Sequence, residues 1–213
     1  MQDAIERTKE YVRRNMEEYK DATHDWFHIE RVWNTAKLIA KEEGADLFVV
    51  EMAALLHDID DFKFNSHETA VKSAAWLQSL GVDSGTAEKI IHIVENISFK
   101  GSAEQNKIQT LEGKVVQDAD RLDAIGAFGI ARAFTYAGYK NIPIFNPSVE
   151  ARENMSFEQY KRTEGSAINH FHEKLLLLKD RMNTKTGRLM AEERHNFMES
   201  YLRQFFKEAK GES

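Results

Sequence analysis

Two chemically versatile side chains, those of His57 and Asp58, directly follow a densely apolar run at residues 52–56. A helix over that run would be buried, and it would end by presenting an imidazole beside a carboxylate. Leaving both groups buried without partners would cost a few kcal/mol each. A divalent cation would satisfy both, because imidazole nitrogen and carboxylate oxygen are common ligands of such ions. The alternative is a histidine at a helix end, beside an aspartate that caps the helix or forms a salt bridge.

A second cluster precedes this pair in the sequence. His24 and His28 are four residues apart, so both could lie on one face of a helix. The apolar residues that follow at helical spacing predict that the nearby face is turned toward the core. His28 could therefore reach a buried site, and Arg31 lies one helical turn after it.

A third cluster consists of Asp118, Asp120 and Asp123, which interrupt an otherwise apolar stretch. A solvent-exposed helix face is a poor explanation for three carboxylates in such surroundings. Asp120 and Asp123 are three residues apart and project together, whereas Asp118 points substantially elsewhere. The alternative explanation is that two arginines, Arg121 and Arg132, neutralise these carboxylates.

The order of four of these residues resembles the signature of the HD-domain superfamily of metal-dependent phosphohydrolases. That signature is a single histidine, then an adjacent His-Asp pair, then a distant aspartate, and His28, His57, Asp58 and Asp120 match it in this order. The flanking sequences also match, because His28 lies in His-x-x-Arg-Val and Asp120 lies in Ala-Asp-Arg-Leu. An isolated His-Asp dipeptide would carry little weight, but four positions with their flanks are specific.

The resemblance extends to a small bacterial subgroup of single-domain HD hydrolases. Three segments carry it, namely Leu-Leu-His-Asp-Ile-Asp-Asp from Leu55, Gln-Asp-Ala-Asp-Arg-Leu-Asp-Ala-Ile-Gly from Gln117 and Asn-His-Phe-His-Glu-Lys-Leu-Leu-Leu-Leu-Lys-Asp from Asn169. Members of this subgroup are similar to the bacterial nucleotide pyrophosphohydrolases. The implied activity is hydrolysis of (deoxy)nucleoside triphosphates to monophosphate and pyrophosphate. The alternatives are a phosphomonoesterase or phosphodiesterase acting on another nucleotide, and a non-catalytic metal-containing nucleotide sensor.

The resemblance implies a metal site made of His28, His57, Asp58 and Asp120, with Asp118 as the alternative to Asp120. Nitrogen and oxygen ligands without thiolate suit one divalent cation. Related enzymes favour Mn²⁺, and Mg²⁺, Co²⁺, Ni²⁺, Fe²⁺ or Zn²⁺ are the alternatives. The cation would lower the pKa of a bound water and polarise the phosphoryl group.

Catalysis also needs a group that orients or deprotonates the attacking water. Asp61 lies four residues after His57, where related phosphohydrolases carry an acidic residue that assists the water, and many of them have glutamate there. Arg31 and Lys63 are expected to meet the negative charge of the phosphates, although Arg31 could brace the fold and Lys63 could be merely exposed. The neighbouring Asp60 is expected to be exposed. Weaker substrate contacts are expected from three further residues: His92, Lys100 and Arg121.

The elements that must position these residues are helices, because the chain has two prolines and many residues that favour helix. Hydrophobic periodicity predicts about eight or nine helices. Their approximate spans are 1–20, 26–43, 47–56, 67–80, 86–97, 108–136, 164–182 and 190–210. The expected fold is an all-α, single-domain helical bundle of the HD-domain type over residues 1–213. It would have a metal-site core at about 20–135, a lid loop at 138–156 that contains both prolines, and C-terminal helices at 157–210.

Composition narrows the classes of function. The chain has no cysteine among its 213 residues, which excludes disulfides, thiolate zinc sites and cysteine nucleophiles. A formal net charge of −6 disfavours broad binding of nucleic acid. No apolar run approaches the roughly 20 residues of a membrane span. We therefore expect a cytoplasmic protein, monomeric or homodimeric, whose partner is a nucleotide substrate and not nucleic acid or membrane.

Overall fold

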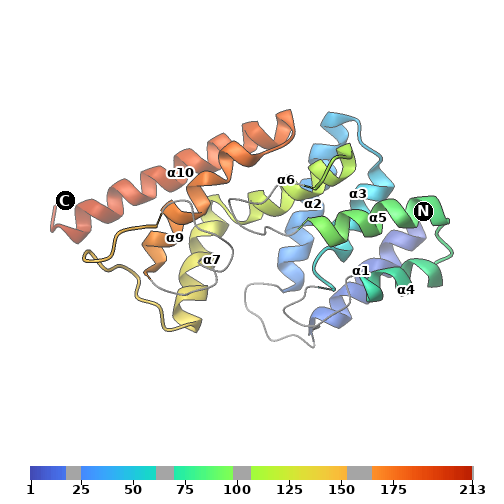
Figure 1. Ribbon diagram of the computed structural model, residues 1–213, viewed down its shortest axis with the longest axis horizontal. Coiled ribbons are helices and arrows are strands. Elements are labelled where there is room, and N and C mark those ends of the chain that lie inside the picture. Colours follow the sequence, from blue (N-terminus) through green and yellow to red (C-terminus); the bar gives the residue numbers. More distant parts are fainter. Residues whose placement is uncertain (18–24, 61–69, 98–106, 153–164, 213) are drawn as a thin grey trace. The chain divides into compact units, whose positions relative to one another are not determined.

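The computed structural model describes residues 1–17, 25–60, 70–97, 107–152 and 165–212. Within these ranges the chain forms nine α-helices, two short 3-10 helices and no β-strand (Figure 1). The predicted all-α class is therefore confirmed. None of the described helices is long and apolar enough to span a lipid bilayer.

The described residues pack into two compact units. One comprises residues 1–97 and 107–120, and the other comprises residues 121–212. The chain passes from the first unit to the second inside one helix, between Asp120 and Arg121. The prediction of one domain over the whole chain stays a prediction, as do the boundaries expected within it.

The first unit is built around a central apolar helix, α3. Its elements are α1 (Gln2–Glu17), α2 (Trp26–Glu43), α3 (Leu47–Leu56), α4 (Val71–Ser79), α5 (Ser84–Asn96) and most of α6 (Leu111–Asp123). Helix α3 packs against α1, α2 and α5, and α4 packs against α5. The side chains of residues 52–56 are fully buried, which agrees with the predicted buried helix. His57 and Asp58 therefore directly follow a helix that lies in the core of this unit.

Local sequence signals set the ends of α2 and α3, and both helices have the predicted bounds. Asp25 caps α2, because its carboxylate accepts a hydrogen bond from the backbone N–H of His28 at 2.9 Å. Gly44 ends α2 in the left-handed conformation, with φ of 73°. Asp46 caps α3 through the N–H groups of the next turn. The sequence between residues 25 and 57 thus places both histidines of the candidate site by local rules.

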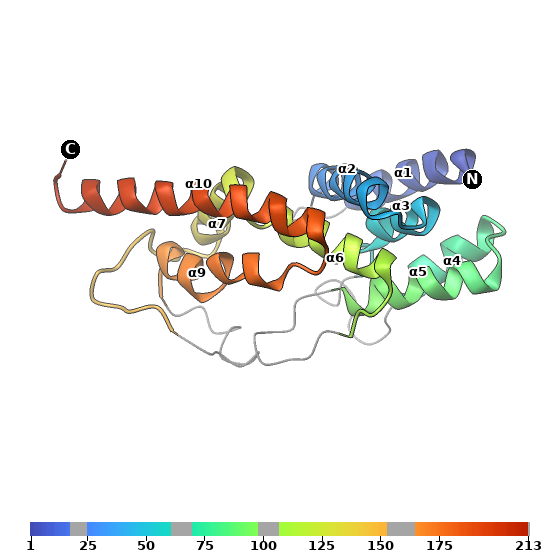
Figure 2. The same ribbon diagram turned by 90° about the horizontal axis from the view of Figure 1, so that it is seen from above.

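The second unit is a smaller helical assembly. It contains α7 (Gly126–Tyr139), α9 (Ala167–Glu173), the 3-10 helices η1 (Leu175–Leu177) and η2 (Lys179–Arg181), and α10 (Lys185–Ala209). Helix α7 lies beside both α9 and α10 (Figure 2). Helix α10 also contacts η2. An aromatic cluster fills the space among the three α-helices, where Phe134, Phe171 and Tyr201 have ring centroids about 6 Å apart.

The structure corrects two of the predicted helices. The stretch 108–136 is two helices, since Ile125 is extended (φ −127°, ψ 169°) and Gly126 has φ of 74°. The apolar periodicity continues through this break because Ile125 is itself buried. The stretch 164–182 forms α9 and two 3-10 turns. Leu175 and Leu178 are both buried there, since residues three apart lie on the same side of a 3-10 helix.

The predicted loop at 138–156 begins slightly later, because α7 continues to Tyr139. Residues 140–152 form no helix or strand, and residues 153–156 lie outside the described part of the chain. The described part of this loop is attached to α9. The carbonyl of Pro143 accepts from Ala167 N at 2.9 Å, and the Arg152 guanidinium pairs with Glu173 at 3.0 Å. A role for the loop as a lid stays a prediction.

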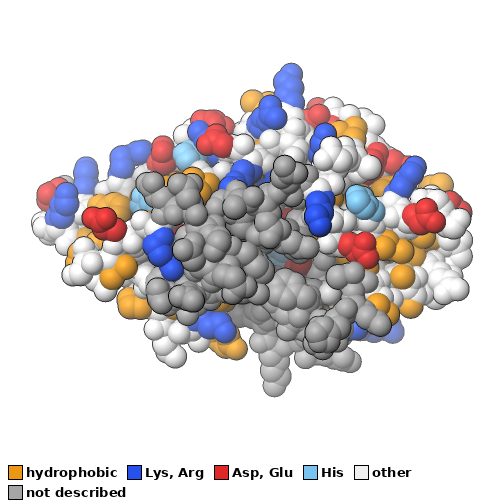
Figure 3. Space-filling model, in the orientation of Figure 1, with side chains coloured by type: hydrophobic (Ala, Val, Ile, Leu, Met, Phe, Trp, Pro, Cys, Tyr) orange, Lys and Arg blue, Asp and Glu red, His pale blue; other side chains and the backbone are white. Residues whose placement is uncertain are grey.

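Surface charge is mixed on the face that Figure 3 shows. Lysine and arginine side chains are interspersed there with aspartate and glutamate side chains. This distribution accompanies the small formal net charge of −6. Such a mixture is typical of solvated helix faces, where most ionisable groups of a helical protein are found.

Candidate metal centre

His28 reaches the site from the first turn of α2. Its side chain is almost fully buried, with the residue 1% exposed. The Asp25 cap fixes the backbone at this position, and Ile29 and Val32 on the same helix lie in the core. His28 is therefore an imidazole held rigidly at a buried position.

His57 and Asp58 lie where α3 ends. His57 is the C-cap residue of α3, with φ of −59° and ψ of −31°. Its Nδ1 lies 2.8 Å from the carbonyl oxygen of Ala54. Because a carbonyl oxygen can only accept, Nδ1 carries the proton and donates it. The Nε2 lone pair is consequently free to serve as a ligand, which is the arrangement found in most metal-binding histidines.

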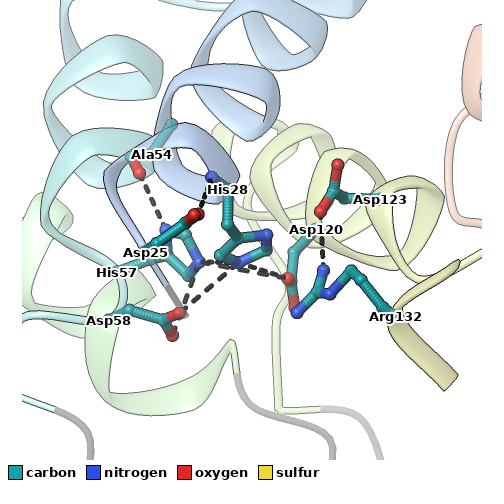
Figure 4. Close-up of polar contacts among 8 residues, drawn as sticks. All are labelled: Asp25, His28, Ala54, His57, Asp58, Asp120, Asp123 and Arg132. Atoms are coloured by element: carbon teal, nitrogen blue, oxygen red, sulfur yellow. Dashed lines mark hydrogen bonds and ion pairs between the residues drawn. The ribbon is translucent and has the colours of Figure 1, made fainter. Parts of the chain in front are cut away.

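The donor atoms of these residues face one another, as Figure 4 shows. The two Nε2 atoms of His28 and His57 are 3.3 Å apart. The carboxylate of Asp58 has one oxygen 3.4 Å from the Nε2 of His28 and the other 3.4 Å from the Nε2 of His57. All three side chains are buried or nearly so.

Asp120 completes the group from α6. Its Oδ1 lies 3.7 Å from the Nε2 of His28 and 3.9 Å from that of His57. Neighbouring ligands of an ion that binds each at about 2.1 Å are separated by roughly 3 Å or more. One donor atom from each of His28, His57 and Asp120 lies within 4.8 Å of the others, so these three residues could hold a metal ion.

The chemistry of the donors also fits a divalent cation. Two carboxylates accompany the buried imidazoles, with the Asp58 side chain 11% exposed and the Asp120 side chain 31% exposed. A divalent cation balances both charges and accepts the two imidazole nitrogens as ligands.

The remaining carboxylates of α6 lie elsewhere. Among the described residues, the donor cluster includes Asp120 and does not include Asp118, which is fully buried. Asp123 does not project with Asp120 into the cluster, and its carboxylate accepts a 2.6 Å charge-assisted hydrogen bond from Arg132 (Figure 4). The alternative explanation for these carboxylates, neutralisation by arginine, therefore holds for Asp123. Arg121 donates to the carbonyl oxygen of Arg181.

The other residues predicted for the site have different positions. Arg31 is half-buried on α2, one turn after His28. His92 is exposed on α5, and its carbonyl oxygen accepts from Asn96 at 2.8 Å. Four residues of the sequence hypothesis lie outside the described part of the chain: His24, Asp61, Lys63 and Lys100.

Sequence reasoning missed the role of Asp60. We expected this side chain to be exposed, and that prediction is wrong. Its carboxylate accepts three hydrogen bonds, from the backbone N–H of Lys72 and from both the N–H and the hydroxyl of Ser73. The partners are 12 and 13 residues away, so no local sequence signal indicates the contact.

Comparisons with known proteins identify the family of this chain. The HD domain family matches residues 26–125, the range that carries all four proposed ligands. The Bacillus subtilis protein YpgQ is 44% identical over 191 residues, which cover 88% of this chain and 85% of YpgQ. The chain belongs to the HD superfamily of metal-dependent phosphohydrolases.

Solved structures of HD-superfamily proteins match nearly the whole length of this chain. The crystal structure of an HD-superfamily hydrolase from Bacillus thuringiensis is 40% identical, with a TM-score of 0.79 and 98% of each chain covered. A crystal structure of B. subtilis YpgQ in complex with ADP is 39% identical, with a TM-score of 0.78, covering 97% of this chain and 95% of YpgQ. The resemblance on which the sequence analysis relied is therefore confirmed, and the protein is an enzyme of this superfamily.

Proposed function

We propose that this HD hydrolase cleaves nucleoside triphosphates to monophosphate and pyrophosphate with one divalent cation, preferably Mn²⁺. The convergence of the His28, His57 and Asp120 donors carries the proposal. The ADP complex of YpgQ supports the substrate class, because ADP combines a base, a ribose and a two-phosphate chain. We assign Asp58 as the fourth ligand, since its carboxylate lies 3.4 Å from both histidine nitrogens.

A bound cation would supply Lewis-acid activation of the phosphoryl group and of water. The residues of the chain hold its ligands in place, since the hydrogen bond to Ala54 keeps the Nε2 of His57 turned toward the site. Arg31, one turn from His28, is proposed to offset phosphate charge, together with Lys63. Asp61 is proposed to take the proton of the attacking water as the new P–O bond forms. The bridging oxygen then leaves with pyrophosphate.

The experiment is a panel of nucleoside mono-, di- and triphosphates and cyclic nucleotides, each with Mn²⁺, Mg²⁺, Co²⁺ or chelator, with products resolved by chromatography. We expect monophosphate and pyrophosphate from triphosphates, and no product with chelator. His57→Ala should abolish both cation binding and turnover. His172→Ala is the matched control, because His172 is an exposed histidine of α9.

Other products would redirect the proposal. Orthophosphate from a monophosphate would indicate a phosphomonoesterase, and opening of a cyclic nucleotide would indicate a phosphodiesterase. Cation and nucleotide binding without turnover of any substrate would indicate a sensor. Contacts of His92, Lys100 and Arg121 with substrate stay predictions, as do the monomeric or homodimeric state, the cytoplasmic location and the absence of nucleic-acid and membrane partners.

A further inference from the structure

Helix α4 begins without a capping residue of its own. The residue before it, Ala70, has φ of 58° and ψ of 22°, and it offers no side-chain acceptor to the first turn. The first backbone N–H groups of a helix have no intrahelical partner, so they need acceptors from elsewhere. Asp60 provides them, because its Oδ1 accepts from Lys72 N at 2.9 Å and its Oδ2 accepts from Ser73 N at 2.9 Å.

The contact between Asp60 and α4 is stronger than a single cap. The Ser73 hydroxyl donates to the same carboxylate at 2.6 Å, and Ser73 is fully buried. Hydrogen bonds to an ionised carboxylate are among the stronger ones in proteins. The N-terminus of a helix also attracts negative charge through the helix dipole. Asp60 is therefore fixed to the start of α4 by three directed bonds.

This attachment lies next to the proposed metal ligands. Asp60 follows Asp58 by two residues, in the turn that comes after α3. His57 is held by the Ala54 carbonyl, the N–H of Ile59 donates to Leu56 O at 3.2 Å, and the Ile59 side chain is 1% exposed. Asp60 supplies the final anchor on the far side of Asp58.

The geometry points to Asp60 as a positioning residue. Its hydrogen bonds to the start of α4 hold the turn in place, so that His57 and Asp58 are oriented to bind the cation. The inference rests on the proposed metal site, but it assigns Asp60 no direct contact with the ion. Both oxygens of the Asp60 carboxylate instead accept hydrogen bonds from the start of α4. Loss of the anchor would free the backbone at residues 58–60 and weaken cation binding.

The test measures Mn²⁺ affinity by calorimetry on the full chain after removal of metal, for the parent, Asp60→Ala and Ser73→Ala. We expect Asp60→Ala to weaken binding about tenfold, the lower end of what loss of a supporting contact costs a metal site. Ser73→Ala removes one of the three bonds and should weaken binding less. The visible spectrum of the Co²⁺-loaded protein should change in Asp60→Ala, because it reports the arrangement of ligands.

Asp83→Ala is the matched control. Asp83 caps α5 in the same unit by accepting from Thr86 N at 3.0 Å, so its loss damages a helix start without touching the ligand turn. Urea unfolding of each metal-free variant distinguishes a loss of stability from a loss of Mn²⁺ affinity. If Asp60→Ala does not fold, the Mn²⁺ affinity of Ser73→Ala tests the inference. If Asp60→Ala or Ser73→Ala binds Mn²⁺ as tightly as the parent does, the positioning role of Asp60 is overturned and the proposed metal site stands. The same holds if Asp83→Ala loses as much Mn²⁺ affinity as Asp60→Ala does. A parent that binds no cation would overturn the proposed metal site, and this inference with it.

Discussion

His170 on α9 makes the stability of the protein depend on pH. His170 is partly buried in the second unit, and Lys174 lies one helical turn after it. Desolvation, with a contribution from the positive charge of Lys174, lowers the pKa of His170 from 6.5 to about 3. The imidazole is therefore neutral in the native protein over the whole range where an ordinary histidine would take up a proton.

The sign of the effect follows from the difference in proton binding. Below pH 6.5 the unfolded chain takes up a proton at His170, and the native chain does not until the pH approaches 3. The contribution of the neutral imidazole to stability is thus present above pH 6.5 and is lost as the pH falls toward 3. With these two pKa values, lowering the pH from 7 to 5 favours the unfolded state by about 2 kcal/mol.

Urea unfolding at pH 7, 6 and 5, followed by circular dichroism, measures this loss. The parent should lose about 2 kcal/mol more than His170→Gln between pH 7 and pH 5, because glutamine does not titrate. His172→Gln is the matched control, since His172 is exposed on the same helix, and it should follow the parent. Contributions of the carboxylates cancel in the comparison. Equal pH dependence in the parent and His170→Gln would refute a lowered pKa for this histidine.

Two further pairs of substitutions, each a test with its control, examine the local structure. Asp25→Ala removes the cap of α2 and should lower the free energy of unfolding by about 1 kcal/mol and also weaken Mn²⁺ binding, because the cap holds the backbone of His28. Asp46→Ala removes the cap of α3 and should lower the free energy of unfolding by a similar amount, but it should leave Mn²⁺ affinity unchanged. Urea unfolding measures the first quantity and calorimetry measures the second. Gly129→Ala should lower stability by about 2 kcal/mol, since a Cβ there would clash with the backbone carbonyl of Ala124, just before the helix. Gly138→Ala on the same helix meets nothing within 4 Å and should not be destabilising, so thermal unfolding that ranks the two equally would contradict this packing.

Local chemistry explains why part of the fold could be predicted from the sequence. Helices α2 and α3 have the predicted bounds because aspartates precede them and a glycine with positive φ ends the first. Burial of α3 followed from its densely apolar sequence, and residues 52–56 are fully buried. The meeting of His28, His57 and Asp120 was expected from a family signature and not from spacing, since the three residues are far apart in the chain.

The missed features depend on contacts that spacing does not encode. Asp60 accepts from residues at the start of α4, beyond a segment whose path no local rule predicts. The carboxylate of Asp123 finds Arg132 on the next helix only because the chain breaks at Ile125. The apolar pattern continues across that break, so hydrophobic periodicity alone predicts one continuous helix there.

The passage from one unit to the other inside α6 limits how such proteins can be recombined. Domains that are exchanged in evolution or excised in the laboratory are usually joined through exposed linkers. Here Asp120 is the last residue of the first unit, and three more residues of the same helix belong to the second. A cut between them would leave a proposed metal ligand at a frayed helix end. The proposed cation site and the unit that follows it therefore cannot be separated by a cut in a linker, because the two share a helix.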